Sequence, residues 1–217
     1  MSSDFNNCLV KAINDALLKL SNGFPNLNIA PLEPLYIPSL TIGEGKGAVH
    51  VVQNFRGINM YGATNGNMTK VDGSKIKEYK LYAEAFTPYL RLEAEYSLNG
   101  RILLIPIQGD GNCTITLENV KTTHLSLGEK LEKKGKVYMR VKKYIVTLDP
   151  GKVIFNFENL FNGDERLGKE MNNILNENWK DVFDDVKSGY EESFGIIFGD
   201  FANRVYSKIP FKDLFLE

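Results

Sequence analysis

The sequence predicts an α+β fold in which a long, curved antiparallel sheet wraps around a long C-terminal helix. Three observations support this prediction: a helical pattern opens the chain, strand-like alternation fills residues 47–157, and helical spacing returns after residue 162. Strands and helices do not alternate along the chain, which excludes the α/β class. No linker or internal repeat divides the sequence, so residues 1–217 are predicted to form one elongated domain.

The first predicted element is an amphipathic helix over residues 5–20, ended by Asn22-Gly23 and Pro25. Its apolar side chains recur at helical spacing: Phe5, Leu9, Ala12, Ile13, Ala16, Leu17 and Leu20. Residues 31–38 contain three prolines, which cannot donate hydrogen bonds to a neighbouring strand. This second segment is therefore predicted to be extended and to lie at an edge of the sheet.

Residues 88–99 alternate between apolar and polar side chains, a pattern typical of a half-buried strand. Asn99-Gly100 predicts a tight hairpin turn, after which residues 101–107 return as a second strand. Gly109-Asp110-Gly111 predicts the next break, and the strand after it has Cys113 on its apolar face.

Residues 136–148 predict an unusually long strand, which at about 3.3 Å per residue spans roughly 43 Å. Its alternation changes phase after Lys142-Lys143. A phase change of this kind predicts a β-bulge, and a bulge bends the sheet.

Helical spacing returns after Asn162-Gly163, with one apolar stripe: Leu167, Met171, Ile174, Leu175, Trp179, Val182, Phe183 and Val186. Ser188-Gly189 predicts a break before a second helix over residues 190–209, roughly 30 Å long. That helix is apolar nearly all round, so it is expected to be enclosed. Gly195 and Gly199 each cost a helix about 1 kcal/mol, which predicts that another element approaches closely there.

Groups that could perform chemistry are few, and enzyme function is not expected. Of the two histidines, His50 is interpreted as a structural residue in a strand and His124 as part of an exposed polar turn. Gly43-Glu44-Gly45-Lys46-Gly47 lacks the spacing of a phosphate-binding loop. The late acidic residues lack a calcium-loop pattern and predict a solvated helix face: Asp181, Asp184, Asp185, Glu191 and Glu192. No metal and no cofactor is expected.

The net charge of −1, from 26 Lys+Arg and 27 Asp+Glu, gives no attraction for nucleic acid or an anionic membrane. No apolar stretch reaches the roughly 18 residues of a membrane-spanning helix. Residues 1–4 lack the features of a secretion signal, but they could follow a removed one, so they do not decide the compartment. Cys8 and Cys113 are either two buried free thiols or one bridge. Asn67 and Asn112 match the glycosylation pattern about as often as chance predicts in a chain so rich in asparagine.

Several segments together resemble the takeout and juvenile-hormone-binding family of insects. The strongest run is Phe157-Glu158-Asn159-Leu160-Phe161-Asn162-Gly163-Asp164, followed by Leu167-Gly168 and Asn176-Glu177-Asn178-Trp179. Further matches are Cys8-Leu9 with Ala12-Ile13, Ile29-x-Pro31-Leu32-Glu33-Pro34-Leu35, and Ile105-Pro106-Ile107-x-Gly109-x-Gly111. They cover nearly the whole chain in the family's order.

The resemblance implies a secreted, extracellular carrier that holds a hormone, fatty acid, isoprenoid or other lipid in an internal hydrophobic tunnel. The chain departs from the family at one point. Members usually carry another cysteine shortly before the position of Cys8, and this sequence has none there, which puts the family's N-terminal disulfide in question.

A long apolar helix inside such a sheet can leave a channel in place of a filled core. Burying one ligand methylene is worth about 0.8 kcal/mol, so a long chain binds without any charged contact. The predicted lining residues are Phe194, Ile197, Phe198, Phe201 and Val205 on the last helix, Trp179 and Phe183 on the preceding one, and Leu92, Tyr96 and Val141 on strands. For each of them, an ordinary core position is an equal alternative. The expected partner is a hydrophobic small molecule or lipid, bound by a monomer.

Two other functions are compatible with the fold. A protein-interaction module would have a filled core and an exposed apolar patch. A membrane-active lipid-transfer protein would need a basic tip, which the near-neutral charge does not favour.

Overall fold

The computed structural model describes residues 3–215. In chain order the elements are α1 (Ser3–Lys19), β1 (Leu35–Ile42), β2 (Val49–Tyr61), β3 (Asn67–Asp72), β4 (Lys80–Ile102), β5 (Ile105–Lys133), β6 (Lys136–Asp149), β7 (Lys152–Phe157), α2 (Glu165–Glu177), α3 (Trp179–Tyr206) and α4 (Phe211–Leu214). The predicted α+β class, with a long curved antiparallel sheet and a long C-terminal helix, is confirmed. The predicted first helix and the predicted edge strand are also present, as α1 and β1.

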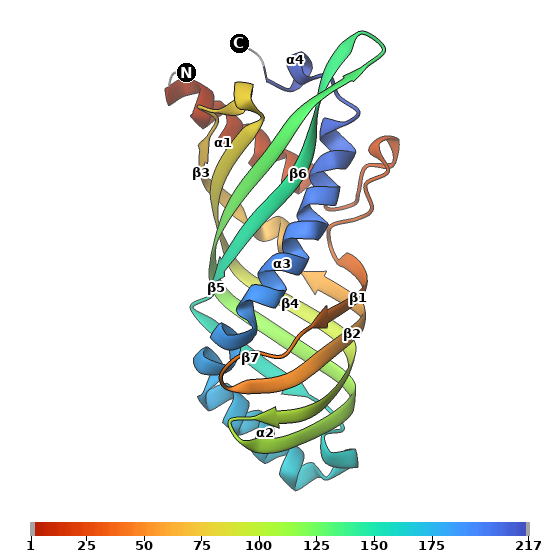
Figure 1. The fold of residues 1–217 in the computed structure, drawn as a ribbon, viewed down its shortest axis with the longest axis vertical. Coiled ribbons are helices and arrows are strands. Elements are labelled where there is room, and N and C mark those ends of the chain that lie inside the picture. Colours follow the sequence, from red (N-terminus) through yellow and green to blue (C-terminus); the bar gives the residue numbers. More distant parts are fainter. Residues whose placement is uncertain (1–2, 216–217) are drawn as a thin grey trace.

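All strands belong to one antiparallel sheet with the order β1-β2-β4-β5-β6, to which β3 adds beside β4 and β7 beside β5. β4 and β5 have 23 and 29 residues and run through most of the elongated molecule (Figure 1). We call the part with β1, β2, β7 and α2 the lower half, and the part with α1, β3, β6 and α4 the upper half. α3 crosses the open side of the sheet and passes through both halves.

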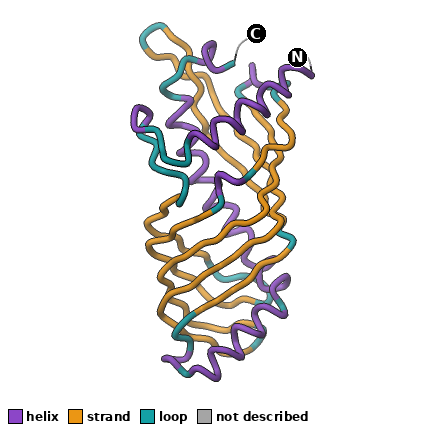
Figure 2. Tube along the Cα trace, turned by 180° about the vertical axis from the view of Figure 1, so that it is seen from behind, coloured by secondary structure: helices purple, strands orange, loops and turns teal. Residues whose placement is uncertain are grey.

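The curvature has an identifiable cause in the sequence. Between Leu127 and Gly128 the register of β5 against β6 shifts, and Lys142 is the extra residue on β6. The predicted bulge at Lys142-Lys143 is therefore confirmed. Seen from behind, the strands of the lower half wrap round the molecule and do not lie flat (Figure 2).

The predicted hairpin turn at Asn99-Gly100 is wrong. β4 continues to Ile102, and the turn is made by Leu103 and Leu104, both with positive φ. Gly100 is needed for another reason, because a Cβ there would collide with the backbone of His50 in β2.

The predicted break at Gly109-Asp110-Gly111 is also wrong, since these residues lie inside β5. A Cβ at Gly109 would collide with Tyr96, and a Cβ at Gly111 would lie 2.9 Å from the carbonyl oxygen of Glu158. These two glycines admit close neighbours and do not end the strand.

The predicted helix break at Ser188-Gly189 is wrong as well, because α3 runs through both residues without interruption. The break lies at Asn178, whose side chain donates to the carbonyl of Ile174 at the end of α2. α3 has 28 residues, so it is about 42 Å long.

α3 is not enclosed on all sides, contrary to the prediction. Every fourth residue forms one exposed stripe: Asp184, Ser188, Glu192, Ile196, Asp200 and Arg204. Ile196 is 64% exposed, although it is apolar. Within residues 3–215, no helix combines the length and the apolar character that crossing a membrane requires.

Both cysteines are free, so the predicted alternative of a bridge between them is not formed. Cys113 is buried as predicted, whereas Cys8 is exposed, contrary to the prediction of a buried thiol.

The predicted close approach at Gly195 and Gly199 is confirmed. A Cβ at Gly195 would lie 2.6 Å from the carbonyl oxygen of Tyr144 in β6, and a Cβ at Gly199 would lie 3.3 Å from the Tyr144 Cβ. The two glycines therefore let α3 rest directly on the backbone of β6.

Gly195→Ala is expected to lower the free energy of unfolding by about 1–2 kcal/mol. The methyl group would push α3 away from β6, at a cost of about 1–3 kcal/mol, which the better helix propensity of alanine offsets by about 1 kcal/mol. Urea unfolding measures the change. Ser188→Ala, on the exposed stripe of α3, is the control and should be slightly stabilising. A Gly195→Ala variant as stable as the wild type would show that this contact is loose.

Candidate functional site

α3 is fastened to both sides of the open sheet by its own polar side chains. On one side, Asp185 accepts hydrogen bonds from the loop between β1 and β2. On the other, the Oδ1 of Asn203 accepts from the Val141 N–H at 2.8 Å, and its Nδ2 donates to the Val141 carbonyl at 3.1 Å. Glu191 Oε1 also accepts from the Leu148 N–H at 2.8 Å. The helix thereby covers the opening of the sheet.

The loop before β2 forms a small anion-binding site that Asp185 occupies. One carboxylate oxygen accepts from the backbone N–H groups of Lys46 at 2.9 Å and Gly47 at 2.8 Å. The other accepts from the Val49 N–H at 2.7 Å. A Cβ at Gly45 would collide with the carboxylate, so a larger residue here would displace the Asp185 side chain. The glycine-rich segment thus binds an anion, but this anion is the protein's own side chain.

The pKa of Asp185 is lowered. Partial burial acts against the charged form, but the three backbone hydrogen bonds outweigh it. The predicted solvated acidic face is therefore wrong for Asp185 and Glu191, which bind backbone donors. It is confirmed for Asp181, Asp184 and Glu192, which are exposed.

The inward face of α3 changes along its length. In the N-terminal half its large apolar and aromatic residues are fully buried: Val182, Phe183, Val186, Tyr190 and Phe194. In the C-terminal half they are only half-buried: Ile197, Phe198, Phe201, Val205 and Tyr206. The first half is packed against protein throughout, whereas the second keeps accessible surface on its apolar face.

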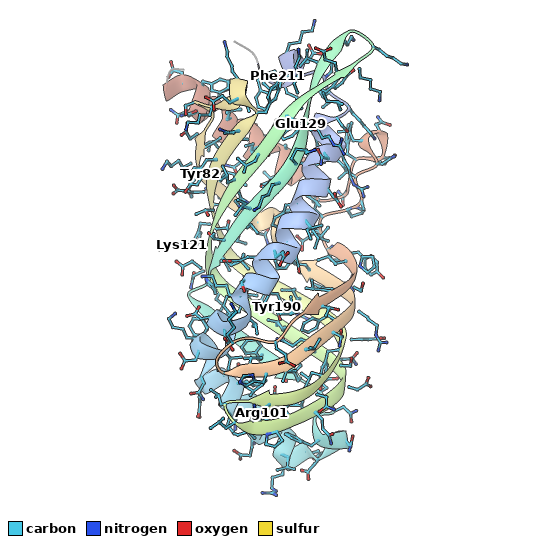
Figure 3. The ribbon with its side chains drawn as sticks, in the orientation of Figure 1. Tyr82, Arg101, Lys121, Glu129, Tyr190 and Phe211 are labelled. Atoms are coloured by element: carbon cyan, nitrogen blue, oxygen red, sulfur yellow. The ribbon has the colours of Figure 1, made fainter. Side chains whose placement is uncertain are left out.

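The interior of the lower half is nearly filled. A void of about 10 Å³, roughly the size of one water-sized sphere, is lined by Leu40, Phe55, Ile58, Leu92, Ala94, Cys113, Ile115 and Tyr190. Tyr190, labelled in Figure 3, donates from its hydroxyl to Gln53 Oε1 at 3.2 Å, and both side chains are buried. Burial raises the pKa of the Cys113 thiol to about 12, so it is neutral at pH 7.

A polar cluster lies on the inner face of β5 in the upper half. Both ring nitrogens of His124 are hydrogen-bonded, Nε2 with Thr122 Oγ1 at 2.8 Å and Nδ1 with the Tyr144 hydroxyl at 3.2 Å. The ring of Phe198 lies over this pair, with centroids 6.0 Å from His124 and 6.1 Å from Tyr144. Burial lowers the pKa of His124 to about 4, so the imidazole is neutral at pH 7.

The prediction of an exposed polar turn at His124 is wrong for a simple reason. Thr122, His124 and Ser126 alternate along a continuous strand, and alternation places all three on one face. That face points toward α3, as the contact with Phe198 shows.

Tyr206 and Tyr144 keep accessible surface although protein surrounds them. Both side chains are half-buried. Burial nevertheless raises the pKa of Tyr206 to about 12, and burial together with the neighbouring Tyr206 raises the pKa of Tyr144. Tyr144 is also among the residues that line an open groove between β6 and α3.

Ser126 differs from its neighbours in the cluster because its hydroxyl has no partner. The side chain is 4% exposed, and its Oγ is the one buried side-chain nitrogen or oxygen without a hydrogen bond in residues 3–215. An unsatisfied buried hydroxyl lowers stability by about 1–3 kcal/mol.

Ser126→Ala is therefore expected to raise the free energy of unfolding, by about 1 kcal/mol. Chemical denaturation of the purified variant measures this. Thr123→Ala is the matched control, because Thr123 is on the opposite face of the same strand and shares an exposed hydrogen bond with Thr147. It should be neutral or mildly destabilising. If Ser126→Ala were the less stable of the two, the serine hydroxyl would have a partner inside the protein.

The predicted lining residues fall into groups. Phe201 and Val205 are half-buried and belong to neither of the two core clusters, while Ile197, Phe198 and Trp179 pack at the margin of the main cluster. Four others are fully buried in that cluster: Leu92, Tyr96, Phe183 and Phe194. Val141 is buried in β6, where Asn203 binds its backbone. The C-terminal residues of α3 thus keep accessible surface, whereas Leu92, Tyr96, Phe183 and Phe194 are part of the filled core.

An open groove lies between the edge of β6 and α3. Its volume is about 550 Å³, and its lining includes Lys142, Lys143, Glu192, Ile196 and Asp200. The lining also includes Val141, Tyr144, Ile145 and Val146, so the groove combines charged and apolar side chains.

Two features of this region were not predicted from the sequence. The cluster around His124 could have been found from the alternation of Thr122, His124 and Ser126. The role of Asp185 had no sequence signal, since nothing in the chain pairs that acid with a loop far away in the sequence.

The fold and interior define a class of protein. A long helix covers a curved antiparallel sheet, the interior between them is lined by apolar and neutral polar groups, and no charged side chain of the described part is among the buried residues. An interior of this kind favours lipophilic molecules over charged ones. Residues 1–216 match the family of haemolymph juvenile hormone binding proteins, and the chain belongs to that family. The family resemblance found in the sequence is thereby confirmed.

Individual relatives agree with this assignment. The chain is 24% identical over 215 residues to the circadian clock-controlled protein daywake of Drosophila melanogaster, covering 96% of this chain and 83% of the relative. It is also 24% identical to daywake of Drosophila yakuba. The crystal structure of Takeout 1 from Epiphyas postvittana superposes with a TM-score of 0.83 at 24% identity, covering 94% of this chain and 93% of the other. This last likeness establishes the fold.

Proposed function

We propose that this protein is a carrier for a long lipophilic molecule, held in the upper half between the C-terminal half of α3 and the inner face of the sheet. The single observation that carries the proposal is the incomplete burial of the inward residues there: Ile197, Phe198, Phe201, Val205 and Tyr206. Apolar side chains at the centre of an elongated protein normally complete their burial against one another. Retained surface at that place favours a space for a guest.

The binding energy would come from apolar contact. At about 0.8 kcal/mol per methylene, ten buried methylenes supply roughly 8 kcal/mol before the losses of association are subtracted. Discrimination between ligands of similar length would be weak along this apolar wall. A fatty acid derivative, an isoprenoid or a hormone-like lipid fits these terms.

We further propose that the carrier acts outside cells as a monomer. The family name places its members in haemolymph, an extracellular fluid. In this reading, Leu92, Tyr96, Phe183 and Phe194 stabilise the lower half, and the ligand contacts Phe198, Phe201 and Val205.

The alternative of a protein-interaction module has less support. It requires a contiguous exposed apolar patch. The exposed large apolar residues are instead distributed over α1, the segment between α1 and β1, β1, β2, β4, the β4–β5 turn, β5, β7, α2 and α3: Leu18, Phe24, Tyr36, Val52, Tyr89, Leu104, Ile105, Ile154, Leu167 and Ile196.

Native mass spectrometry of the purified protein, followed by solvent extraction, tests the carrier proposal. We expect one lipophilic molecule per chain, either co-purified or taken up from a panel of long-chain lipids. If no lipid co-purified and none was taken up from the panel, the proposal would be contradicted.

A further inference from the structure

The inner face of β5 in the upper half carries three polar residues in a row, Thr122, His124 and Ser126. Across the strand pair, Ser126 lies directly opposite Tyr144. Side chains opposite each other in an antiparallel pair have their Cβ atoms about 4.5–5.5 Å apart. Ser126 therefore lies beside the hydrogen-bonded group of Thr122, His124 and Tyr144, but its hydroxyl takes no part in their hydrogen bonds.

Two hydroxyl groups of this region are left without partners inside the protein. The Ser126 Oγ is buried and unbonded. The Tyr206 hydroxyl makes no hydrogen bond within residues 3–215, although Tyr206 is close enough to Tyr144 to influence its ionisation. A buried hydroxyl is normally satisfied, so the unbonded Ser126 Oγ calls for a partner that enters from outside, and the half-buried Tyr206 hydroxyl is a second group that such a partner can reach.

The charge of the surroundings limits what that partner can be. His124 is neutral at pH 7 because burial lowers its pKa to about 4. No lysine or arginine is among the buried residues of the described chain. A carboxylate would find hydrogen-bond donors there but no counter-charge, and burying an unpaired charge is strongly unfavourable. A neutral oxygen, by contrast, can accept from or donate to the hydroxyls.

We propose that Ser126 and Tyr206, supported by the Thr122–His124–Tyr144 group, bind the polar end of the ligand, and that this end is a neutral oxygen function such as a hydroxyl, ketone or ester. The inference rests on the proposed carrier function and adds the orientation of the ligand: its head group lies against β5 and its apolar chain lies along α3. Rotation about χ1 moves the Ser126 Oγ between three staggered positions, so it can meet a ligand oxygen without backbone movement.

The test compares four probes of equal chain length, dodecanol, methyl dodecanoate, dodecanoic acid and dodecane, by displacement of a naphthylamine fluorescent reporter at pH 7.5. Ser126→Ala should lower the affinity for dodecanol and for methyl dodecanoate about three- to tenfold, which is the effect of one lost hydrogen bond. The affinity for dodecane should change by less than about twofold. Because each probe is compared on two proteins, the hydrophobicity of the probe itself cancels. Tyr206→Phe should show the same selectivity. In the wild type, dodecanoic acid should bind more weakly than its methyl ester.

Thr123→Ala, whose side chain is on the outer face of the same strand, should leave all four affinities unchanged. If Ser126→Ala lowered the affinities for dodecanol and dodecane equally, or lowered neither, the head-group site would be overturned and the carrier proposal would stand. Tighter binding of dodecanoic acid than of its ester would overturn the neutral character of the head group. Failure of all four probes to displace the reporter, together with an absence of lipid in native mass spectra, would overturn the carrier proposal and this inference with it.

Discussion

Asp185→Ala is expected to lower the free energy of unfolding by about 2–4 kcal/mol. The substitution removes three hydrogen bonds to a charged acceptor and leaves the N–H groups of Lys46, Gly47 and Val49 without their partner. Hydrogen bonds to charged groups are worth about 1.5–3 kcal/mol each, and water replaces part of what is lost at this half-buried site. Urea unfolding followed by circular dichroism measures the change.

Asp184→Ala is the matched control for this prediction. Asp184 is the preceding residue in α3 and forms an exposed i,i+4 ion pair with Lys180. Such pairs contribute about 0.3–0.5 kcal/mol, so this variant should be nearly neutral. If both variants lost the same small amount, the loop before β2 would not depend on the carboxylate.

The contribution of Asp185 should also depend on pH. Its pKa is lowered in the folded protein, so the stabilisation is complete above the unfolded pKa of about 3.9 and is lost as the pH falls through the lower folded pKa. The stability difference between the wild type and Asp185→Asn should therefore be constant from pH 7 to about pH 5 and shrink below about pH 4. A difference that stays constant down to pH 2 would contradict the assigned direction.

Phe198→Trp is expected to reduce the affinity for the longest ligands about tenfold or more. The residue lies beside His124 and Tyr144, at the margin of the main core, with part of its surface free. A larger ring there would exclude about two ligand methylenes, and each is worth about 0.8 kcal/mol. Affinity for short ligands should fall less, because they do not need the full space. Titration with fatty alcohols of increasing length measures the effect.

Ile196→Trp is the control on the same helix. Ile196 belongs to the exposed stripe of α3, so the bulk it gains projects into solvent. The affinities of the Ile196→Trp variant should equal those of the wild type at every chain length of the alcohol. If Phe198→Trp, correctly folded, bound the longest alcohols as well as the wild type, Phe198 would lie outside the binding space. Phe198→Asp should abolish loading altogether, since it places a charge in the interior.

The fold could be predicted from the sequence because its main elements have strong periodic patterns. The alternation in residues 88–99 was sufficient to predict a long strand, and the phase change at Lys142-Lys143 was sufficient to predict a bend. The predicted turns were wrong because glycine occurs both in turns and where a neighbouring group approaches closely. At Gly100, Gly109 and Gly111 it admits a neighbouring backbone or side chain, and only the three-dimensional arrangement distinguishes this from a turn.

The candidate site could be predicted only in part. The C-terminal residues of α3, such as Phe198 and Phe201, followed from the apolar character of that helix. The hydroxyl of Ser126 could not be predicted, because the absence of a hydrogen bond is a property of the packed structure. The pairing of Asp185 with residues 46–49 likewise depends on how α3 crosses the sheet.

Photolabelling with a diazirine-bearing fatty alcohol, followed by mapping of the labelled residues, shows where the ligand lies. Label is expected to accumulate on inward residues of α3, chiefly Ile197, Phe198, Phe201 and Val205, and excess unlabelled alcohol should suppress it. Label concentrated on Ile196 and on Lys142 or Lys143 would place the ligand in the outer groove and contradict an internal binding space.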